Sequence, residues 1–296
     1  MSGRAATRSW RKRKRTAFLM ILATLLAIFI LAPFAWLIMT SFMHEKDALS
    51  VPPQWIPAHP TLSNYLTFFH PSGVGALVGS RAAEDTLPGI VNSLIVATGT
   101  AFLNVILGAL AGYSFARLKF RGSHSLLMLY LGSRMVPGIA LIIPLYLMVR
   151  LLGLLDTLPA LMLTYMSFTL PFTIWLLKSY FQGIPRAVEE AALVDGCTWG
   201  QMLFKVLLPM AAPGLAGAGM FAFMTAWNDY LFAVILTNTM ASKTVTVVVA
   251  GFATDVTTAR TLMTTGGVLA VIPPLVLAVL FRNFVVEGLT AGAVKG

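Results

Sequence analysis

The sequence predicts an all-α integral membrane protein with six transmembrane helices and a short cytoplasmic helix-turn-helix between the fourth and fifth of them. Hydrophobic residues make up 57% of the 296 residues and charged residues only 11%, less than half of the charged share of a soluble domain. Uncharged apolar stretches long enough to cross a bilayer, about 20 residues each, recur along the chain. Basic residues gather at alternate ends of these stretches, as they do on the cytoplasmic side of a membrane.

The first span is expected at residues 17–42, after a basic N-terminal segment at 1–16 that contains the run Arg11 to Arg15. This stretch is too long for a secretory signal and lacks its small-residue cleavage site. We interpret the basic run as a topology signal rather than as a specific site for anionic lipid. A proline-rich extracytoplasmic loop is expected at 43–86.

The membrane core is expected at 87–285, followed by a cytoplasmic tail at 286–296. Pro137 and Pro144 interrupt the third span and the pair Pro273-Pro274 interrupts the sixth. We expect kinks or unwound turns there, where neighbouring groups or water can satisfy the freed carbonyls. The five spans of the core are placed at about 87–116, 126–149, 158–177, 210–236 and 262–281.

The charge distribution fixes the expected orientation. With the N-terminus inside, most basic residues near span ends lie inside and many acidic residues lie outside, so both termini are cytoplasmic. The net charge of +10 is then a property of a protein of the inner cell membrane, in contact with lipid, and not evidence for nucleic acid as a partner.

The inner loop at 180–209 has strong helix signals. Pro185 stands at the expected start of a helix, with two carboxylates in its early turns, and the pair Asp195-Gly196 ends it. Thr198 and Gln201 then have the spacing of a capping box that opens a second short helix, ending near Leu208-Pro209. An ordinary amphipathic connector would explain the helices alone, but not the residue pattern that they contain.

That pattern resembles the EAA motif of the permease subunits of ABC importers. Glu190-Ala191-Ala192 is followed after three residues by Gly196, and after nine more by Val206 and then Leu208-Pro209. Val206 stands where isoleucine is common in that family. The resemblance implies that the loop forms a coupling helix seated in a cleft on a cytoplasmic ATPase. The residues assigned to this coupling role are Glu190, Ala191, Ala192, Asp195, Gly196, Val206, Leu208 and Pro209.

Three further segments resemble the shorter, six-helix permease of the maltose-type carbohydrate importers: 53–57 with 61–65, 226–230, and the tail 288–296. The resemblance implies a homologous second permease subunit, two ATP-binding-cassette ATPase subunits and an extracytoplasmic solute-binding protein. ATP and Mg would then be bound by the ATPase partners and no cofactor by this chain. It also implies that Gly292 and Lys295 in the tail reach the ATPase.

Two ionisable residues lie within predicted spans, Arg134 and Asp229, where charge is costly and usually faces a cavity or a partner. Asp229 is flanked by Trp227, Asn228 and Tyr230, the aromatic and hydrogen-bonding groups that a sugar requires. These five residues are candidates for the substrate pathway, although an interhelical polar contact is an equal alternative. Three roles are open to Arg134: it pairs with Asp229, lines the pore or extends toward a membrane interface. We favour the pairing with Asp229.

No catalytic or metal site is expected. The single cysteine, Cys197, has no partner, and the four histidines are scattered. The chain also lacks a phosphate-binding Gly-rich loop, so it is not expected to hydrolyse ATP itself. The main rival is a stand-alone secondary transporter, and an ABC importer of a non-carbohydrate solute is a second alternative. The candidate pathway residues are compatible with disaccharides, longer oligosaccharides, amino sugars and glycerol-phosphate-type solutes alike.

Overall fold

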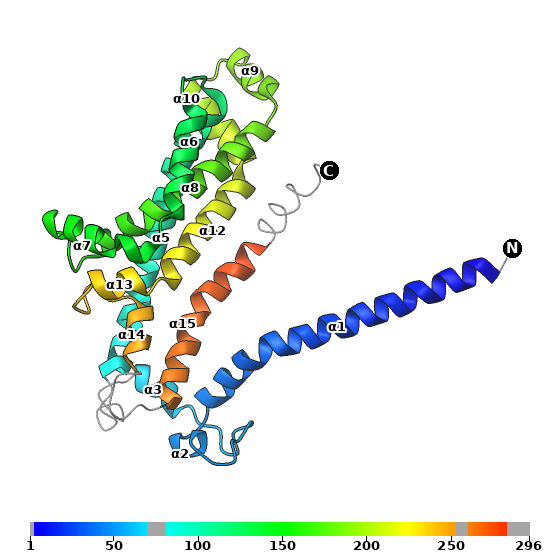
Figure 1. The fold of residues 1–296 in the computed structure, drawn as a ribbon, viewed down its shortest axis with the longest axis vertical. Coiled ribbons are helices and arrows are strands. Elements are labelled where there is room, and N and C mark those ends of the chain that lie inside the picture. The colour runs from blue at the N-terminus through cyan, green and yellow to red at the C-terminus, as the bar shows by residue number, and fades with distance from the viewer. Residues whose placement is uncertain (1–2, 70–80, 253–259, 283–296) are drawn as a thin grey trace.

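Helices are the only regular secondary structure in the residues that the computed structural model describes, 3–69, 81–252 and 260–282 (Figure 1). Four helices contain segments long and apolar enough to cross a membrane: α1 (Gly3–Ser41), α5 (Arg81–Arg117), α8 (Leu158–Gly183) and α15 (Arg260–Leu280). Two bent helix pairs pass the same test if each pair is counted as one span. The prediction of an all-α membrane protein with six spans is confirmed in this sense.

The third span is broken rather than continuous. It consists of α6 (Ser123–Gly132), the 3-10 turns η2 (Ser133–Met135) and η3 (Gly138–Leu141), and α7 (Ile142–Leu151). The two halves meet at 94°. The break falls at Pro137, because proline has no N–H to donate and holds the preceding residue, Val136, in an extended conformation.

The fifth span does not run continuously over 210–236 as predicted. The segment α10 (Trp199–Met202), the π turn η4 (Leu203–Leu207) and α11 (Leu208–Met210) leads at a 77° bend into α12 (Ala212–Asn228). A separate helix, α13 (Leu231–Leu236), follows.

Asp229 explains this interruption. Its carboxylate accepts a hydrogen bond at 3.0 Å from the backbone N of Phe232, in the first turn of α13. Its carbonyl accepts one at 2.7 Å from the hydroxyl of Thr246, in α14 (Val245–Gly251). The irregular backbone is therefore satisfied by side chains, as is required away from water.

Prolines within other helices have a smaller effect. Pro171 lies inside α8, and Pro273 and Pro274 lie inside α15, yet both helices continue through them. The expected unwinding thus occurs at Pro137 but not at the proline pair of the sixth span.

The centre of the molecule is the packing of α5 against α8 and α12. Gly108 and Gly112 of α5 allow the close approach: a Cβ at Gly112 would lie 3.0 Å from the backbone N of Lys178 in α8. Similarly, a Cβ at Gly214 of α12 would lie 2.5 Å from the ring of Tyr180. These glycines therefore serve close helix packing.

Helix α1 extends away from the other helices, and its apolar span is unburied (Figure 1). It contacts α15 near its C-terminal end, next to the short helices α2 (Glu45–Ala48) and α3 (Ser63–Phe69). Glu45 caps α15, because its carboxylate accepts from the backbone N of Arg260 at 2.8 Å and of Thr261 at 3.0 Å. This end of the molecule lies opposite the end that carries α10 (Figure 1).

Candidate functional site

The loop with the Glu-Ala-Ala pattern folds as two short helices. The first, α9 (Arg186–Val194), begins after Pro185 and ends at Asp195. Gly196 follows with φ +85°, a left-handed conformation that strains a residue with a Cβ. The predicted end of the first helix at Asp195-Gly196 is therefore present.

The second helix starts at the predicted capping box. The hydroxyl of Thr198 accepts from the backbone N of Gln201 at 3.3 Å, and the side-chain oxygen of Gln201 accepts from the backbone N of Thr198 at 2.9 Å. Val206 lies in the π turn, and Leu208 and Pro209 lie in α11 just before the bend into α12. A π turn next to a bend is typical of a functional hinge.

The two faces of α9 differ in their surroundings. Ala192 is buried in an apolar cluster with Phe181 and Leu177 of α8 and Met202 of α10. Glu190 and Ala191 are exposed on the other side. Two large apolar residues at the tip of the loop are also exposed, Val194 at 86% and Trp199 at 65%. The loop is thus held from within and presents an apolar tip with acidic residues beside it.

An ion pair between α5 and α9 was missed by the sequence analysis. Arg117, the last residue of α5, pairs through Nε with the carboxylate of Glu189, and its Nη2 donates to the carbonyl of Ile184 at 2.8 Å. The side chains of Arg117 and Glu189 are only 9% and 12% exposed. The pattern of the sequence carries no signal for this pair, since the two residues are 72 positions apart.

Three of the predicted pathway residues lie together. Trp227, Asn228 and Tyr230 border an open cavity of about 550 Å³ between the end of α12, α14 and α15. Trp227 is buried and stacks on Phe223 at 5.7 Å, whereas Tyr230 is 47% exposed. The remaining lining residues are Val245, Thr246, Val249, Ala250, Met263, Ala270, Val271 and Pro274. The cavity combines an aromatic ring with hydroxyl and amide groups, as a carbohydrate site does.

Asp229 and Arg134 are not part of this lining. The carboxylate of Asp229 accepts from the hydroxyl of Tyr165 in α8 at 3.1 Å, in addition to the backbone N of Phe232 in α13. The guanidinium of Arg134 lies over the rings of Phe172 and Phe221, 5.4 and 5.3 Å from their centroids. The favoured pairing of Arg134 with Asp229 is therefore wrong: the break at Pro137 brings Arg134 to two aromatic faces, which stabilise a cation.

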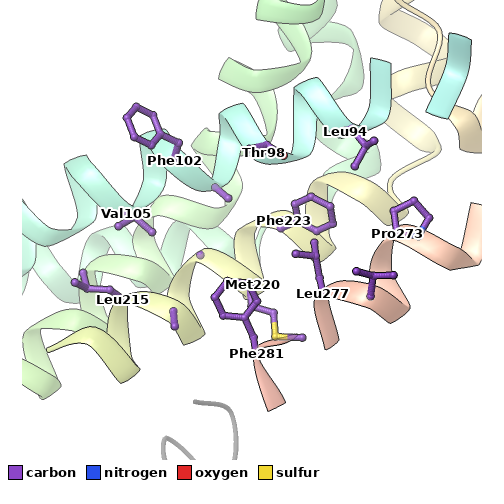
Figure 2. Close-up of a pocket in the computed structure, with 14 residues that line it drawn as sticks. Leu94, Thr98, Phe102, Val105, Leu215, Met220, Phe223, Pro273, Leu277 and Phe281 are labelled. Atoms are coloured by element: carbon purple, nitrogen blue, oxygen red, sulfur yellow. The ribbon is translucent and has the colours of Figure 1, made fainter. Parts of the chain in front are cut away.

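A second cavity, of about 640 Å³, lies between α5, α12 and α15 (Figure 2). Figure 2 shows Leu94 and Phe102 from α5, Met220 from α12 and Leu277 from α15 along it. Thr98 is the single polar side chain among its fourteen lining residues. Sugar hydroxyls need hydrogen-bond partners, so this groove suits an apolar occupant.

Asp156 joins two loops. It lies in the turn between α7 and α8 with φ 61°. Its carboxylate accepts from the backbone N of Asn238 at 2.7 Å and of Thr239 at 2.9 Å, and also from the hydroxyl of Ser242. Partial burial raises the pKa of Asp156, but the hydrogen bonds from Ser242, Asn238 and Thr239 outweigh it and hold this pKa well below its usual range.

Residues 104–291 match the family described as the binding-protein-dependent transport system inner membrane component. The match covers more than half of the chain, including the loop with the Glu-Ala-Ala pattern. The chain belongs to this family. It is a multi-pass membrane protein and a permease subunit of ABC-importer systems.

Curated relatives of this permease family agree over nearly the full length. The trehalose transport system permease protein SugB of Mycobacterium tuberculosis is 36% identical over 96% of this chain and 99% of its own. The trehalose/maltose transport system permease protein MalG of Thermococcus litoralis is 32% identical over 94% and 96%. The diacetylchitobiose uptake system permease protein DasC of Streptomyces coelicolor is 31% identical over 93% and 96%.

Solved structures of ABC permeases share the fold. A bacterial ABC transporter involved in the import of the acidic polysaccharide alginate aligns with a TM-score of 0.66 and 23% identity, over 92% of this chain and 97% of that one. The methionine transporter MetNI aligns with a TM-score of 0.54 and 20% identity, over 68% of this chain and 95% of that one. The helical arrangement in Figure 1 is therefore that of an ABC-importer permease.

Two predicted residues of the permease tail, Gly292 and Lys295, lie outside the described residues. Their contact with an ATPase stays a prediction. The stand-alone secondary transporter, by contrast, does not agree with membership in a family of binding-protein-dependent systems.

Proposed function

We propose that this permease subunit forms half of the pathway through which an ATP-driven importer moves a sugar into the cell. The loop α9–α10 carries the proposal, because its exposed apolar tip needs a protein surface to cover it. Val194 and Trp199 are large apolar side chains that are left open in the single chain. Exposed apolar surface rimmed by charge is typical of an interface.

The same loop is held rigidly enough to transmit force. Apolar contacts of Ala192 and the ion pair of Glu189 fix α9 to the membrane helices. The chain is a transport component, and we place ATP and Mg in two ATPase partners, one of which docks on Glu190, Ala191 and the loop tip of this chain. The tail residues Gly292 and Lys295 are proposed to add to this contact.

The basic residues support the orientation with this loop in the cytoplasm. Five basic residues lie at this end of the membrane helices. Arg186 is in α9 and Lys205 is in η4. Arg117 ends α5 and pairs with Glu189 of α9, and Lys119 and Arg121 follow it before α6. Cations are retained on the cytoplasmic side. Both termini are then cytoplasmic, α2, α3 and α14 face outward toward a solute-binding protein, and membrane lipid covers the exposed face of α1.

A sugar is the proposed solute. The curated relatives named above transport trehalose, maltose or diacetylchitobiose by their names. In this chain, Tyr230 and Asn228 offer an exposed ring and an amide at the cavity of about 550 Å³. A homologous second permease subunit is proposed to supply the other half of the pathway. Titration of the cognate binding protein with a panel of sugars identifies the solute.

Substitution at Gly196 tests the coupling role. A Cβ at this position meets no atom within 4 Å, so any cost arises from the backbone at φ +85° and not from a clash. We expect Gly196→Val to reduce transport by the assembled complex at least about fivefold, since a β-branched residue at this φ costs more than 1 kcal/mol and distorts the turn. Gly196→Asn is the matched control, because asparagine tolerates the left-handed region.

The measurement is solute uptake and ATP hydrolysis by the complex with its ATPase, second permease and liganded binding protein in proteoliposomes. Wild-type uptake and ATPase activity in Gly196→Val would contradict the coupling role of this loop. A wild-type chain that assembles with no ATPase would contradict the proposed function as a whole.

A further inference from the structure

The pair formed by Arg117 and Glu189 links the end of α5 directly to α9. The guanidinium bonds to both sides of the turn between α8 and α9: to the carboxylate of Glu189 and, at 2.8 Å, to the carbonyl of Ile184. Both charged side chains are about nine-tenths buried. A buried charge is tolerated only while its partner is in place, so α5 and α9 are constrained to keep their relative positions.

The other end of α5 holds a loop on the opposite side of the molecule. Asn92 donates through Nδ2 to the carbonyls of Met240 at 2.9 Å and Lys243 at 3.0 Å. The hydroxyl of Ser93 accepts from the backbone N of Val245 at 2.8 Å. The segment 237–244 between α13 and α14, here called the outer loop, is thus attached to α5 by Asn92, and the start of α14 directly after it by Ser93.

Helix α5 is uninterrupted between these two attachments. The chain from Asn92 to Arg117 contains no proline and is helical throughout, which gives a rod of roughly 37 Å at 1.5 Å per residue. The route from α9 through α10 passes the π turn and the 77° bend. Helix α8 is also continuous, but it contains Pro171, which removes one N–H from the backbone hydrogen bonds of the helix.

We propose that Arg117 is a positioning residue that makes α5 the rod connecting the ATPase-docking loop to the outer loop. Displacement of α9 by the ATPase then shifts α5 along with it, and Asn92 and Ser93 move the outer loop at the far end. The inference rests on the proposed function, because it needs α9 to be the element on which the ATPase acts. It adds a residue pair and a route to that function.

The test uses the full complex with ATPase, second permease and liganded binding protein in proteoliposomes. The variants are Arg117→Gln, Glu189→Gln, the charge-swapped pair R117E/E189R, and Arg117→Lys, which keeps the charge without the fork of donors. Arg121→Gln is the matched control, an exposed cation in the segment that follows α5. The readout is solute transported per ATP hydrolysed, which does not depend on the amount of folded complex.

We expect each neutral variant to lower this ratio at least fivefold, Arg117→Lys to lower it less, and the charge swap to recover at least half of the loss. Asn92→Ala is expected to lower it from the other end of α5 with the ion pair intact. Wild-type ratios in the neutral variants would overturn the inference while leaving the proposed function intact. A fall in total uptake that follows only the yield of assembled complex, at a wild-type ratio, would also overturn it, and so would a lowered ratio with no recovery in the charge swap. Absence of ATP-driven transport in the wild type and in Arg121→Gln would instead reject the proposed function.

Discussion

Replacing Gly108 by alanine tests the close packing of α5 on α8. The new Cβ would lie 2.4 Å from Cγ2 of Thr173 and 3.5 Å from Cδ1 of Leu177. Carbon atoms in contact are separated by about 3.5–4.0 Å, so the introduced methyl group and that of Thr173 would overlap by roughly 1 Å. Thr173 is fully buried in α8 and has few alternative rotamers.

Two opposing free-energy terms decide the outcome. Overpacking a core costs about 1–3 kcal/mol, whereas alanine in a helix interior is favoured over glycine by up to about 1 kcal/mol. Gly217→Ala in α12 gains the helix preference of alanine without an overpacking cost, because a Cβ there meets no atom within 4 Å. The difference in unfolding free energy between the two variants therefore isolates the steric term, and we expect Gly108→Ala to be less stable by about 1–3 kcal/mol.

The assay is reversible unfolding of the isolated chain in mixed micelles, followed by tryptophan fluorescence. Thr173→Ser deletes Cγ2 and is expected to remove most of the penalty in the double variant G108A/T173S. Equal stability of Gly108→Ala and Gly217→Ala within about 0.5 kcal/mol, the usual error of additivity, would refute the reasoning. So would the absence of any coupling between Gly108→Ala and Thr173→Ser.

Two further predictions concern Asp156 and the cavity that Tyr230 lines. Asp156→Asn replaces a carboxylate by an amide facing the backbone N–H groups of Asn238 and Thr239. We expect the free energy of unfolding to fall by about 1 kcal/mol at neutral pH, a value kept small because solvent weakens the hydrogen bonds of an exposed carboxylate. Because the folded pKa of Asp156 is lowered, this stabilisation is complete above the ordinary value of about 3.9 and declines as the pH falls below it; a constant difference in Tm between the two proteins from pH 7 to pH 2 would contradict this account. Tyr230→Ala removes an exposed ring from the cavity of about 550 Å³, and we expect kcat/KM for transport to fall about fivefold, since a ring contact is worth about 1 kcal/mol. Val271→Ala, from the same lining, is the control, and equal effects of the two variants would argue against a solute contact at Tyr230.

The sequence predicted the features that depend on neighbouring residues. The end of α9 at Asp195-Gly196 and the capping box of Thr198 were both predicted correctly. Each depends on residues within one helical turn, because a cap or a left-handed turn is determined by local backbone and side-chain chemistry. The family was likewise indicated by the spacing from Glu190 to Pro209.

Features that depend on residues far apart in the chain required the tertiary structure. The sequence marked Asp229 as a charge in a span but favoured Arg134 as its partner. In the folded chain, Tyr165 and the backbone of Phe232 bind Asp229, and Arg134 lies over two aromatic rings. The expected continuous helix over 210–236 is wrong for the same reason, since the carboxylate of Asp229 binds the first turn of a new helix there.

The sequence by itself determined that this chain crosses a membrane and presents a loop of the ABC-importer type. The first follows from long apolar stretches and the second from the spacing of residues within one loop, and both patterns involve residues near one another in the chain. Only the tertiary structure decided what holds that loop. The pair of Arg117 with Glu189 joins residues 72 positions apart. Buried ions need partners, but nothing local specifies which partner the fold will supply.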